Sequence, residues 1–220
     1  MTLRLISFAG CPFVERAKVA LRERGIDHEV IDIDLRDQPD WFGALSPRGK
    51  VPVLDVDGTA LFESGAILEY IEDAFPGPSL RPADVLQRAH DRAWFSFASE
   101  VLFSAMWAWM TAAHADAAEA AEEQIHGALR VLEPALDGRD WLSGTGAAFG
   151  FADVGFAPGL IRLHAFARHG WIALPDDLPN VLSWIDRIST RKAVMESYAS
   201  DATDRLVSSL AATNGRVLGA

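Results

Sequence analysis

The first 75 residues carry short runs of alternating or continuous apolar positions, separated by stretches with the spacing of an amphipathic helix. Pro12 suits the first position of a helix, Gly25 suits its end, and Asp57-Gly58 favours a tight hairpin turn. The expected elements are strands at 3–8, 28–33, 53–56 and 60–62 and helices at 12–24, 41–45 and 66–74. The order β-α-β-α-β-β-α predicts a mixed sheet with helices packed against it.

The rest of the chain shows no strand pattern and is rich in alanine at helical spacings. A segment rich in proline and glycine, residues 76–82, separates it from the first part. We therefore expect two domains, an α/β domain over residues 1–77 and an all-α domain over residues 84–220, joined by a linker at 78–83.

Composition narrows the possible functions. Half of the residues are hydrophobic, and 20 lysines and arginines against 31 acidic residues give a net charge of −11. This acidity argues against binding to nucleic acid or to an anionic membrane, because both need a basic surface. The longest nearly apolar run, Val101–Met110, is too short to span a bilayer, and the N-terminus has no apolar signal core. We therefore expect a cytoplasmic protein.

Cys11 is the only cysteine, so the chain cannot form an internal disulfide. A lone cysteine is more often buried and inert than reactive. Here it lies between a strand and a helix that begins at Pro12, and the free N–H groups of a helix N-terminus stabilise a thiolate. Arg16 and Lys18 can add positive potential. Because residue 14 is valine, any disulfide of Cys11 must be with another molecule, which points to a thiol cosubstrate.

Two further motifs lie beside the predicted strands. The segment from Ser46 to Leu54 places Pro52 just before a strand, where a trans bond is the common form and a cis bond the alternative. A cis bond would turn the backbone of Val51 toward a ligand, which could then pair with it like an added strand. Glu63-Ser64 precedes the last helix of the domain, where Ser64 is suited to act as a plain cap or to bind a carboxylate.

Together these motifs resemble the thioredoxin-like domain of cytosolic glutathione transferases. The resemblance covers nearly all of residues 1–77, and Cys-Pro-Phe is similar to the omega-like and related cysteine classes. It rests on Cys11-Pro12-Phe13, on Ser46-Pro47 with Gly49 to Leu54, and on Leu61 to Ser64 with Ile67 and Tyr70-Ile71. It implies a thioredoxin-like N-terminal domain, an all-α C-terminal domain and a homodimer.

The resemblance also implies roles for single residues. The backbone of Val51 pairs with the cysteinyl part of glutathione, and Pro52 is the cis proline that permits this pairing. Glu63-Ser64 holds the γ-glutamyl end, and Lys50 is a partner for the glycyl carboxylate. The implied glutathione-binding residues are Phe13, Lys50, Val51, Pro52, Glu63 and Ser64, and the implied catalytic residue is Cys11.

Thiol exchange is the reaction that the cysteine classes favour: the cysteine thiolate takes up glutathione, and a second glutathione removes it. The implied activities are thiol transfer, dehydroascorbate reduction and removal of glutathione from S-glutathionyl adducts, and conjugation to a hydrophobic electrophile stays open. Two alternatives stay open as well, a non-catalytic regulatory or protein-binding member of the fold and a glutathione-dependent dehalogenase or isomerase. The complete set of implied binding residues favours an enzyme.

The second substrate is expected between the two domains. The first long helix of the all-α domain carries many large apolar side chains, most of which would pack in a core: Trp94, Phe95, Phe97, Phe103, Met106, Trp107, Trp109 and Met110. Trp107 and Met110 share one face and are the candidate pocket residues. So apolar a pocket suits a hydrophobic co-substrate and suits polar dehydroascorbate less well. The six histidines do not cluster, so we expect no metal site.

One motif of the family is incomplete in this chain. The segment Gly150–Pro158 resembles a helix start at which family members place serine or threonine at the cap and aspartate three residues later. Here Gly150 stands at the cap and only Asp153 is retained, so the reciprocal capping box is incomplete. Because glycine is a tolerable cap, we expect the fold to be unchanged.

Overall fold

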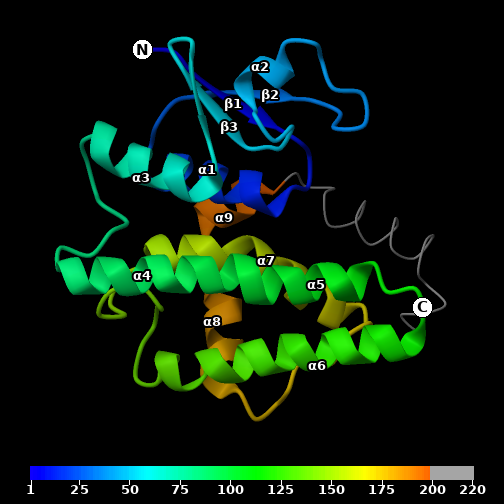
Figure 1. The fold of residues 1–220 in the computed structure, drawn as a ribbon. Coiled ribbons are helices and arrows are strands. Elements are labelled where there is room, and N and C mark those ends of the chain that lie inside the picture. Colours follow the sequence, from blue (N-terminus) through cyan, green and yellow to red (C-terminus); the bar gives the residue numbers. More distant parts are fainter. Residues whose placement is uncertain (199–220) are drawn as a thin grey trace.

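The computed structural model describes residues 1–198, so the last part of the expected all-α domain, residues 199–220, lies outside the described residues. A four-stranded sheet lies at one end of the molecule and a set of long helices at the other (Figure 1). The strands are β1 (Leu3–Ser7), β2 (Glu29–Asp32), β3 (Val53–Val56) and β4 (Thr59–Phe62), in the order β2-β1-β3-β4. The pair β1–β2 is parallel, and the other two pairs are antiparallel. All four expected strands are confirmed.

Three helices belong to the sheet: α1 (Pro12–Glu23), α2 (Phe42–Leu45) and α3 (Ser64–Ala74). Helices α1 and α3 pack together between the sheet and the helical part, where they bury Leu21 and Ile67 (Figure 1). The prediction that Ser64 caps the last helix is wrong. Glu63 holds the cap position with φ 69°, so the chain turns directly from β4 into the helix and Ser64 is already helical.

The helical part begins with a continuous rod made of α4 (Val85–Phe97), a π-helical turn η1 (Ala98–Leu102) and α5 (Phe103–Met110). The elements that follow are α6 (Ala115–Leu132), the 3₁₀ turn η2 (Pro134–Leu136), α7 (Phe151–Arg168), α8 (Pro179–Thr190) and α9 (Lys192–Ser197). Helix α7 is the central element, because it is buried over most of its length against α1, α4 and α8. Within residues 1–198, no helix combines the length and hydropathy needed to cross a bilayer.

The incomplete cap of α7 is repaired by Ser143, from the loop before the helix. Its hydroxyl accepts hydrogen bonds from the N–H groups of Ala152 (2.9 Å) and Asp153 (3.3 Å), while the Asp153 carboxylate accepts from Gly150 N–H (2.9 Å). Ser143 therefore does the work of the missing cap side chain. A Cβ on residue 150 would lie 2.8 Å from the Cβ of Ser143 and 2.5 Å from the Leu80 carbonyl oxygen, so the position requires glycine.

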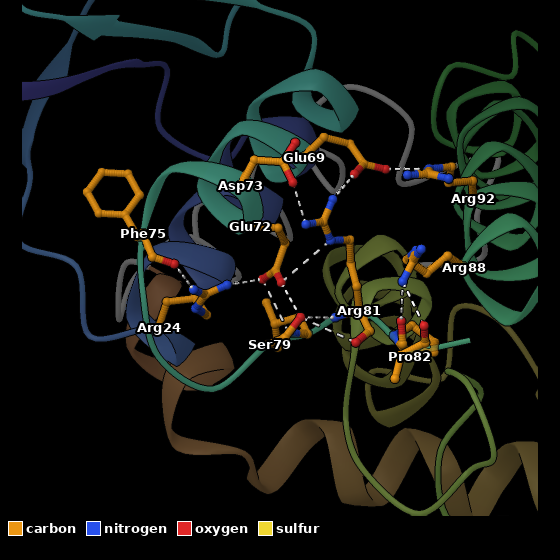
Figure 2. Close-up of polar contacts among 12 residues, drawn as sticks. Arg24, Glu69, Glu72, Asp73, Phe75, Ser79, Arg81, Pro82, Arg88 and Arg92 are labelled. Carbon is orange, nitrogen blue, oxygen red and sulfur yellow. Dashed lines mark hydrogen bonds and ion pairs between the residues drawn. The ribbon is translucent and has the colours of Figure 1, made fainter. Parts of the chain in front are cut away.

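A polar network holds residues 75–84, which form neither helix nor strand between α3 and α4 (Figure 2). Arg24, just after α1, makes a buried ion pair of 2.5 Å with Glu72 of α3 and also donates to the Phe75 carbonyl. Glu72 accepts from the Ser79 hydroxyl (2.5 Å) and from Leu80 N–H (3.2 Å). The network thus joins α1, α3 and the connecting segment. The expected domain limits at 77 and 84 stay a prediction.

Arg81 extends this network to α4. Its guanidinium contacts Glu69 (2.7 Å), Asp73 (2.5 Å) and Glu72 (3.7 Å), all on α3. The second oxygen of Glu69 accepts from Arg92 of α4 at 2.5 Å (Figure 2). Charged side chains therefore link α3 directly to the first helix of the helical part.

Candidate functional site

The predicted site residues meet at one end of the sheet because of its register. Ile6, near the end of β1, pairs with Val53, the first residue of β3, and Val53 pairs with Phe62, the last residue of β4. The segments that continue from these strand ends therefore emerge side by side. They are the turn before Cys11, the Val51-Pro52 segment and Glu63-Ser64.

Cys11 occupies the N-cap position of α1. A turn precedes it, in which Cys11 N–H donates to the Phe8 carbonyl at 3.1 Å and Gly10 adopts φ 82°, a conformation that favours glycine. The side chain is half-buried, and its Sγ lies 4.0 Å from the Val51 carbonyl oxygen, to which the thiol donates. The structure thus brings the side chain of Cys11 to the backbone of Val51.

The groups around Cys11 act on the pKa of its thiol in opposite directions. Burial raises the pKa of the thiol above its usual value of 9.0, and the carboxylate of Glu15 adds to this. The backbone N–H groups of Val14 and Phe13 and the guanidinium of Arg162 act against the rise and favour the thiolate. Because burial dominates, the pKa of the thiol is raised in this structure, so the helix N-terminus alone does not produce the thiolate that the sequence suggested.

The Val51–Pro52 peptide bond is cis, the form that the resemblance implied. Val51 is buried, and among the described residues its N–H has no hydrogen-bond partner. Lys50 is exposed, and the Ser46 hydroxyl fixes its backbone by accepting from its N–H (2.9 Å) and donating to its carbonyl (2.8 Å). The segment therefore presents an unpaired backbone donor beside an exposed ammonium group.

Glu63-Ser64 lies next to this segment at the start of α3. The Glu63 carboxylate is exposed and accepts from Arg48 at 2.9 Å, so it is already part of a surface ion pair. Ser64 is buried as a residue, and no described residue bonds to its hydroxyl. A free hydroxyl at a helix N-terminus can hold a carboxylate.

A row of apolar side chains runs from Phe13 of α1 through the buried Phe103 along α5. The ring of Phe13, which is 36% exposed, meets Phe103 of α5 edge to face at 5.7 Å. Trp107 follows Phe103 by one helical turn and is 65% exposed, and Met110, three residues on, is half-buried. The candidate pocket residues therefore continue a stripe of apolar side chains that starts two residues from Cys11.

Arg162 of α7 clamps the turn that carries Cys11. Its guanidinium forms a buried ion pair with Glu15 of α1 (2.7 Å) and donates to the Gly10 carbonyl (2.6 Å). It also donates to the Pro158 carbonyl (2.7 Å) and to the hydroxyl of Tyr198. Burial alone would lower the pKa of Arg162, but Tyr198, Glu15 and Cys11 together raise it above its usual value.

Arg16, also on α1, is completely buried where α1 meets the helical part. Its Nε donates to the Gly155 carbonyl (2.8 Å) and its Nη1 to the Ser99 hydroxyl (2.7 Å). The guanidinium carbon also lies over the rings of Phe95 (4.2 Å) and Phe103 (4.5 Å). This residue ties the cysteine-bearing helix to α7 and to the π-helical turn.

Two glycines of α7 make room for these rings. A Cβ on Gly155 would lie 2.8 Å from the Phe95 ring, and one on Gly159 would lie 2.4 Å from the Phe103 ring. The Gly-x-x-x-Gly spacing places both glycines on the face of α7 that contacts the rod of α4, η1 and α5. The close approach of the helices therefore depends on the absence of side chains at 155 and 159.

Sequence reasoning missed Glu15, Arg162 and Tyr198, which hold the Cys11 turn. Two of their bonds join residues 147 and 152 positions apart, so no local pattern signals them. Two cavities, of about 460 and 380 Å³, lie elsewhere, lined by residues within 138–187 and 79–150. None of the predicted site residues lines either cavity. Within residues 1–198, no three His, Cys, Asp or Glu side chains gather as metal ligands.

Comparison with known protein families matches both parts of the chain. The profile described as "Glutathione S-transferase, N-terminal domain" matches residues 5–79, and that described as "Glutathione S-transferase, C-terminal domain" matches residues 115–187. Glutathione S-transferase omega-1 of Sus scrofa is 38% identical over 100 residues, 45% of this chain. The matched part spans only 42% of that relative.

Two other relatives match over most of their length. Probable glutathione S-transferase GSTU1 of Oryza sativa is 30% identical over 90% of both chains. The crystal structure of rice GST1 in complex with glutathione superposes with a TM-score of 0.85, at 27% identity over 98% of both chains. Protein LigF of Sphingobium sp. is 29% identical over 94% of this chain and 97% of that one. The crystal structure of the beta-etherase LigF has a TM-score of 0.74 at 27% identity, over 90% of this chain and 98% of that one.

Proposed function

The chain belongs to the glutathione S-transferase family, and from this premise we propose that it binds glutathione at the Cys11 end of the sheet and catalyses glutathione-dependent thiol transfer through Cys11. The observation that carries the proposal is the position of the sulfur. Cys11 stands at the N-cap position of α1, and its Sγ lies 4.0 Å from the carbonyl oxygen of Val51, a residue whose own N–H is unpaired among the described residues. A bound peptide-like thiol that paired with Val51 would meet this sulfur.

The surrounding groups support glutathione as that thiol. Glutathione has a carboxylate at each end and a cysteinyl amide between them. The Ser64 hydroxyl and the N-terminus of α3 suit the γ-glutamyl carboxylate, the Val51 backbone suits the cysteinyl amide, and the exposed Lys50 suits the glycyl carboxylate. In this proposal Glu63 receives the γ-glutamyl ammonium group and exchanges its partner Arg48 for the ligand.

The proposed reaction proceeds in two exchanges. The Cys11 thiol gives up its proton, and the thiolate attacks the glutathione sulfur of a mixed disulfide. A Cys11–glutathione disulfide forms as the old S–S bond breaks, and the departing thiolate takes a proton to become a thiol. A second glutathione thiolate then attacks the bound glutathione sulfur, which releases glutathione disulfide and restores the Cys11 thiolate. Because Cys11 is the only cysteine, no internal thiol competes in the second step.

The test uses Cys11→Ala beside wild type. Wild type should reduce 2-hydroxyethyl disulfide with glutathione, and the variant should lose at least about 100-fold in kcat/KM while still binding to glutathione-agarose. Ser64→Ala is the matched control on the binding side, and it should raise the KM for glutathione with little change in kcat. Full thiol-transfer activity in Cys11→Ala would refute the proposal.

A second candidate reaction is conjugation of glutathione to an aromatic electrophile, or the related ether cleavage that the name beta-etherase gives to LigF. The observation that favours it is the apolar stripe of Phe13, Phe103 and Trp107 beside the sulfur. A panel of aryl halides and β-aryl ethers should separate the two reactions. If Cys11→Ala retains conjugation and loses only thiol transfer, another group activates glutathione for conjugation.

We also propose a cytoplasmic homodimer, as the family resemblance implies. A rice relative that is named as a cytosolic glutathione S-transferase supports the location. Val85 and Leu86, which are 68% and 65% exposed at the start of α4, are candidate contacts between subunits. Light scattering should give twice the mass of one chain, and Leu86→Glu should shift the protein toward the monomer if this surface is the interface.

A further inference from the structure

The turn that presents Cys11 has few contacts of its own. Phe8, Ala9 and Gly10 are exposed, and a Cβ on Gly10 would meet no atom within 4 Å. One internal bond, from Cys11 N–H to the Phe8 carbonyl at 3.1 Å, closes the turn. Exposed segments with few buried contacts open locally at a low cost in free energy. A fixed position of the sulfur therefore depends on contacts from elsewhere in the chain.

Arg162 of α7 provides such a contact. Its Nη2 donates to the Gly10 carbonyl at 2.6 Å, and no other side chain in residues 1–198 bonds to the turn at residues 8–10. The same guanidinium donates to both carboxylate oxygens of Glu15 on α1, at 2.7 and 3.0 Å. Because a guanidinium is planar and rigid, the two bonds to Glu15 also fix the direction of the donor to Gly10. Arg162 thus joins the turn to both α1 and α7.

Tyr198 in turn holds the guanidinium. Its hydroxyl accepts from Nη1 of Arg162 and donates to the Pro158 carbonyl at 3.0 Å. The Pro158 carbonyl also accepts from Arg162 at 2.7 Å. Helix α9, which ends one residue before Tyr198, packs against α1 (Figure 1). The last described residue of the chain therefore takes part in the network around the Cys11 turn.

This network ends at the backbone that carries the sulfur. Sγ of Cys11 lies 4.0 Å from the carbonyl oxygen of Val51, on the segment where glutathione is proposed to bind. We infer that Arg162 and Tyr198 are positioning residues for the reactive sulfur: together they fix the turn before Cys11 and so hold Sγ beside the Val51 backbone. This role rests on the proposed function, because the sulfur that it places is the nucleophile of that reaction.

A loosened turn should affect two reactions of Cys11 differently. Exchange with a disulfide bound at the site requires the attacking sulfur at a defined distance and angle, and a displacement of about 1 Å can cost roughly 100-fold in rate. A small alkylating reagent makes no such demand, because it approaches the thiol from solvent. Turnover with glutathione should therefore fall, while alkylation of the free protein should be no slower than in wild type.

Tyr198→Phe in the full chain is the first test. The variant keeps the ring, which lies 5.0 Å from the guanidinium carbon of Arg162, and removes only the hydroxyl. It should lower kcat for 2-hydroxyethyl disulfide reduction by about tenfold and change the KM for glutathione by less than about twofold. Alkylation by iodoacetamide, which reports only Cys11 because it is the single cysteine, should be at least as fast as in wild type.

Tyr70→Phe is the matched control, because Tyr70 is the other tyrosine of the chain and no described residue bonds to its hydroxyl. It should leave both reactions unchanged. Arg162→Lys is the second test. The lysine keeps a cation beside Glu15 but has no rigid set of donors for Glu15 and Gly10 together. It should lower kcat by about tenfold or more, while its melting temperature stays closer to that of wild type than the melting temperature of Arg162→Met.

A spectroscopic measurement follows the turn without glutathione. Protein labelled with ¹⁵N-cysteine gives a single labelled amide, that of Cys11, whose N–H closes the turn. Solvent exchange of this amide measures local opening. It should be about tenfold faster in Tyr198→Phe and in Arg162→Lys than in wild type, and unchanged in Tyr70→Phe.

Unchanged amide exchange in the folded Tyr198→Phe or Arg162→Lys variant would overturn the inference. So would an unchanged kcat, because the turn would then be held without consequence for the reaction. Slower alkylation in Tyr198→Phe would also overturn it, since the variant would then act on the reactivity of the thiol itself. If wild type lacked thiol-transfer activity, the proposed function would fail, and faster exchange in both variants would still assign Arg162 and Tyr198 to fixing the turn.

Discussion

Two buried arginines lie near the two ends of α1, and they differ in whether a carboxylate compensates their charge. Just past the C-terminal end of α1, Arg24 pairs with Glu72, and the carboxylate also accepts from Ser79 and Leu80 (Figure 2). Near its N-terminal end, Arg16 is equally buried and has only neutral partners. Both arginines join α1 to other parts of the molecule. The difference is that Arg24 has a carboxylate partner, whereas Nη2 of Arg16 has no partner among the described residues.

The difference matters because paired and unpaired buried charges have different effects on nearby groups. A compensated ion pair lowers the cost of burial and sets geometry, but it produces little net potential. An uncompensated charge costs stability and acts on any titratable neighbour. At Cys11 the two members of such a pair act in opposite directions, because Arg162 lowers the pKa of the thiol and its partner Glu15 raises it. Variants at paired and unpaired charges should therefore differ in what they change, stability or the thiol pKa.

The largest effect is expected at the compensated C-terminal end. Arg24→Met would leave the Glu72 carboxylate buried without its cation and remove the donor to the Phe75 carbonyl. Breaking such a pair typically costs about 3–5 kcal/mol in free energy of unfolding. Urea denaturation should show this loss, while the thiol pKa of Cys11 stays as in wild type.

Glu72→Gln added to Arg24→Met provides the control. The glutamine keeps an acceptor for Leu80 N–H and removes the unpaired charge, so part of the lost stability should return. A loss below about 1 kcal/mol in the single variant would mean that the pair is not the compensated link described here.

A smaller loss in free energy of unfolding is expected from Arg162→Met, which breaks the ion pair between Arg162 and Glu15 near Cys11. The variant would leave Glu15 buried without its cation and free the Gly10 carbonyl, at a cost of about 3 kcal/mol. Because an unpaired buried carboxyl takes up a proton, the variant loses both the favourable and the unfavourable charge near Cys11. The thiol pKa of Cys11 should therefore change little, and a large shift would show that the two charges do not offset each other at the sulfur.

Local patterns in the sequence are sufficient for the elements and for the Cys11, Val51 and Glu63-Ser64 motifs, because each depends on residues close in the chain. The caps are not predictable in this way: the pattern indicates Ser64 as the cap of α3 and gives no sign that Ser143 caps α7. Glu63 takes a left-handed conformation, and Ser143 replaces a side chain seven residues later in the chain. Both choices follow from tertiary packing.

The charged residues illustrate the same limit at longer range. Arg16 is visible in the sequence as a positive group near Cys11, but its lack of a charged partner depends on residues that lie 83 and 139 positions away. No local signal distinguishes such a side chain from an exposed one. The roles assigned by resemblance to Phe13 and Lys50, and the pocket roles of Trp107 and Met110, stay predictions.

The packing that encloses Arg16 gives a third prediction. Gly159→Ala would place a methyl group 2.4 Å from the Phe103 ring, and the displacement should cost about 1–3 kcal/mol. Since Phe103 covers both Arg16 and Phe13, the thiol pKa should change as well. Gly127→Ala in α6 is the matched control, because nothing lies within 4 Å of its added methyl. That variant should be stabilised by up to about 1 kcal/mol through helix propensity.

The smallest effect is expected at Asp91 of α4, which tests whether an uncompensated charge always marks chemistry. Asp91 is buried, accepts from Gly144 N–H at 2.9 Å, and has a second oxygen without a partner. Burial and the nearby Asp153 raise its pKa from 3.8 to about 6. The folded state therefore binds more protons than the unfolded state between about pH 4 and pH 6, so stability falls as pH rises through this range.

Asp91→Asn should remove this slope and stabilise the protein at pH 7 by about 1 kcal/mol, after allowance for solvent screening. Thermal unfolding of both proteins between pH 4 and pH 7 gives the measurement. Thiol-transfer activity should not change, because no group of the proposed site contacts Asp91. A steeper slope in the variant would contradict the raised pKa. A loss of activity would mean that Asp91 acts on the reaction from outside the proposed site, and that an unpaired buried charge can mark function without contacting the reacting groups.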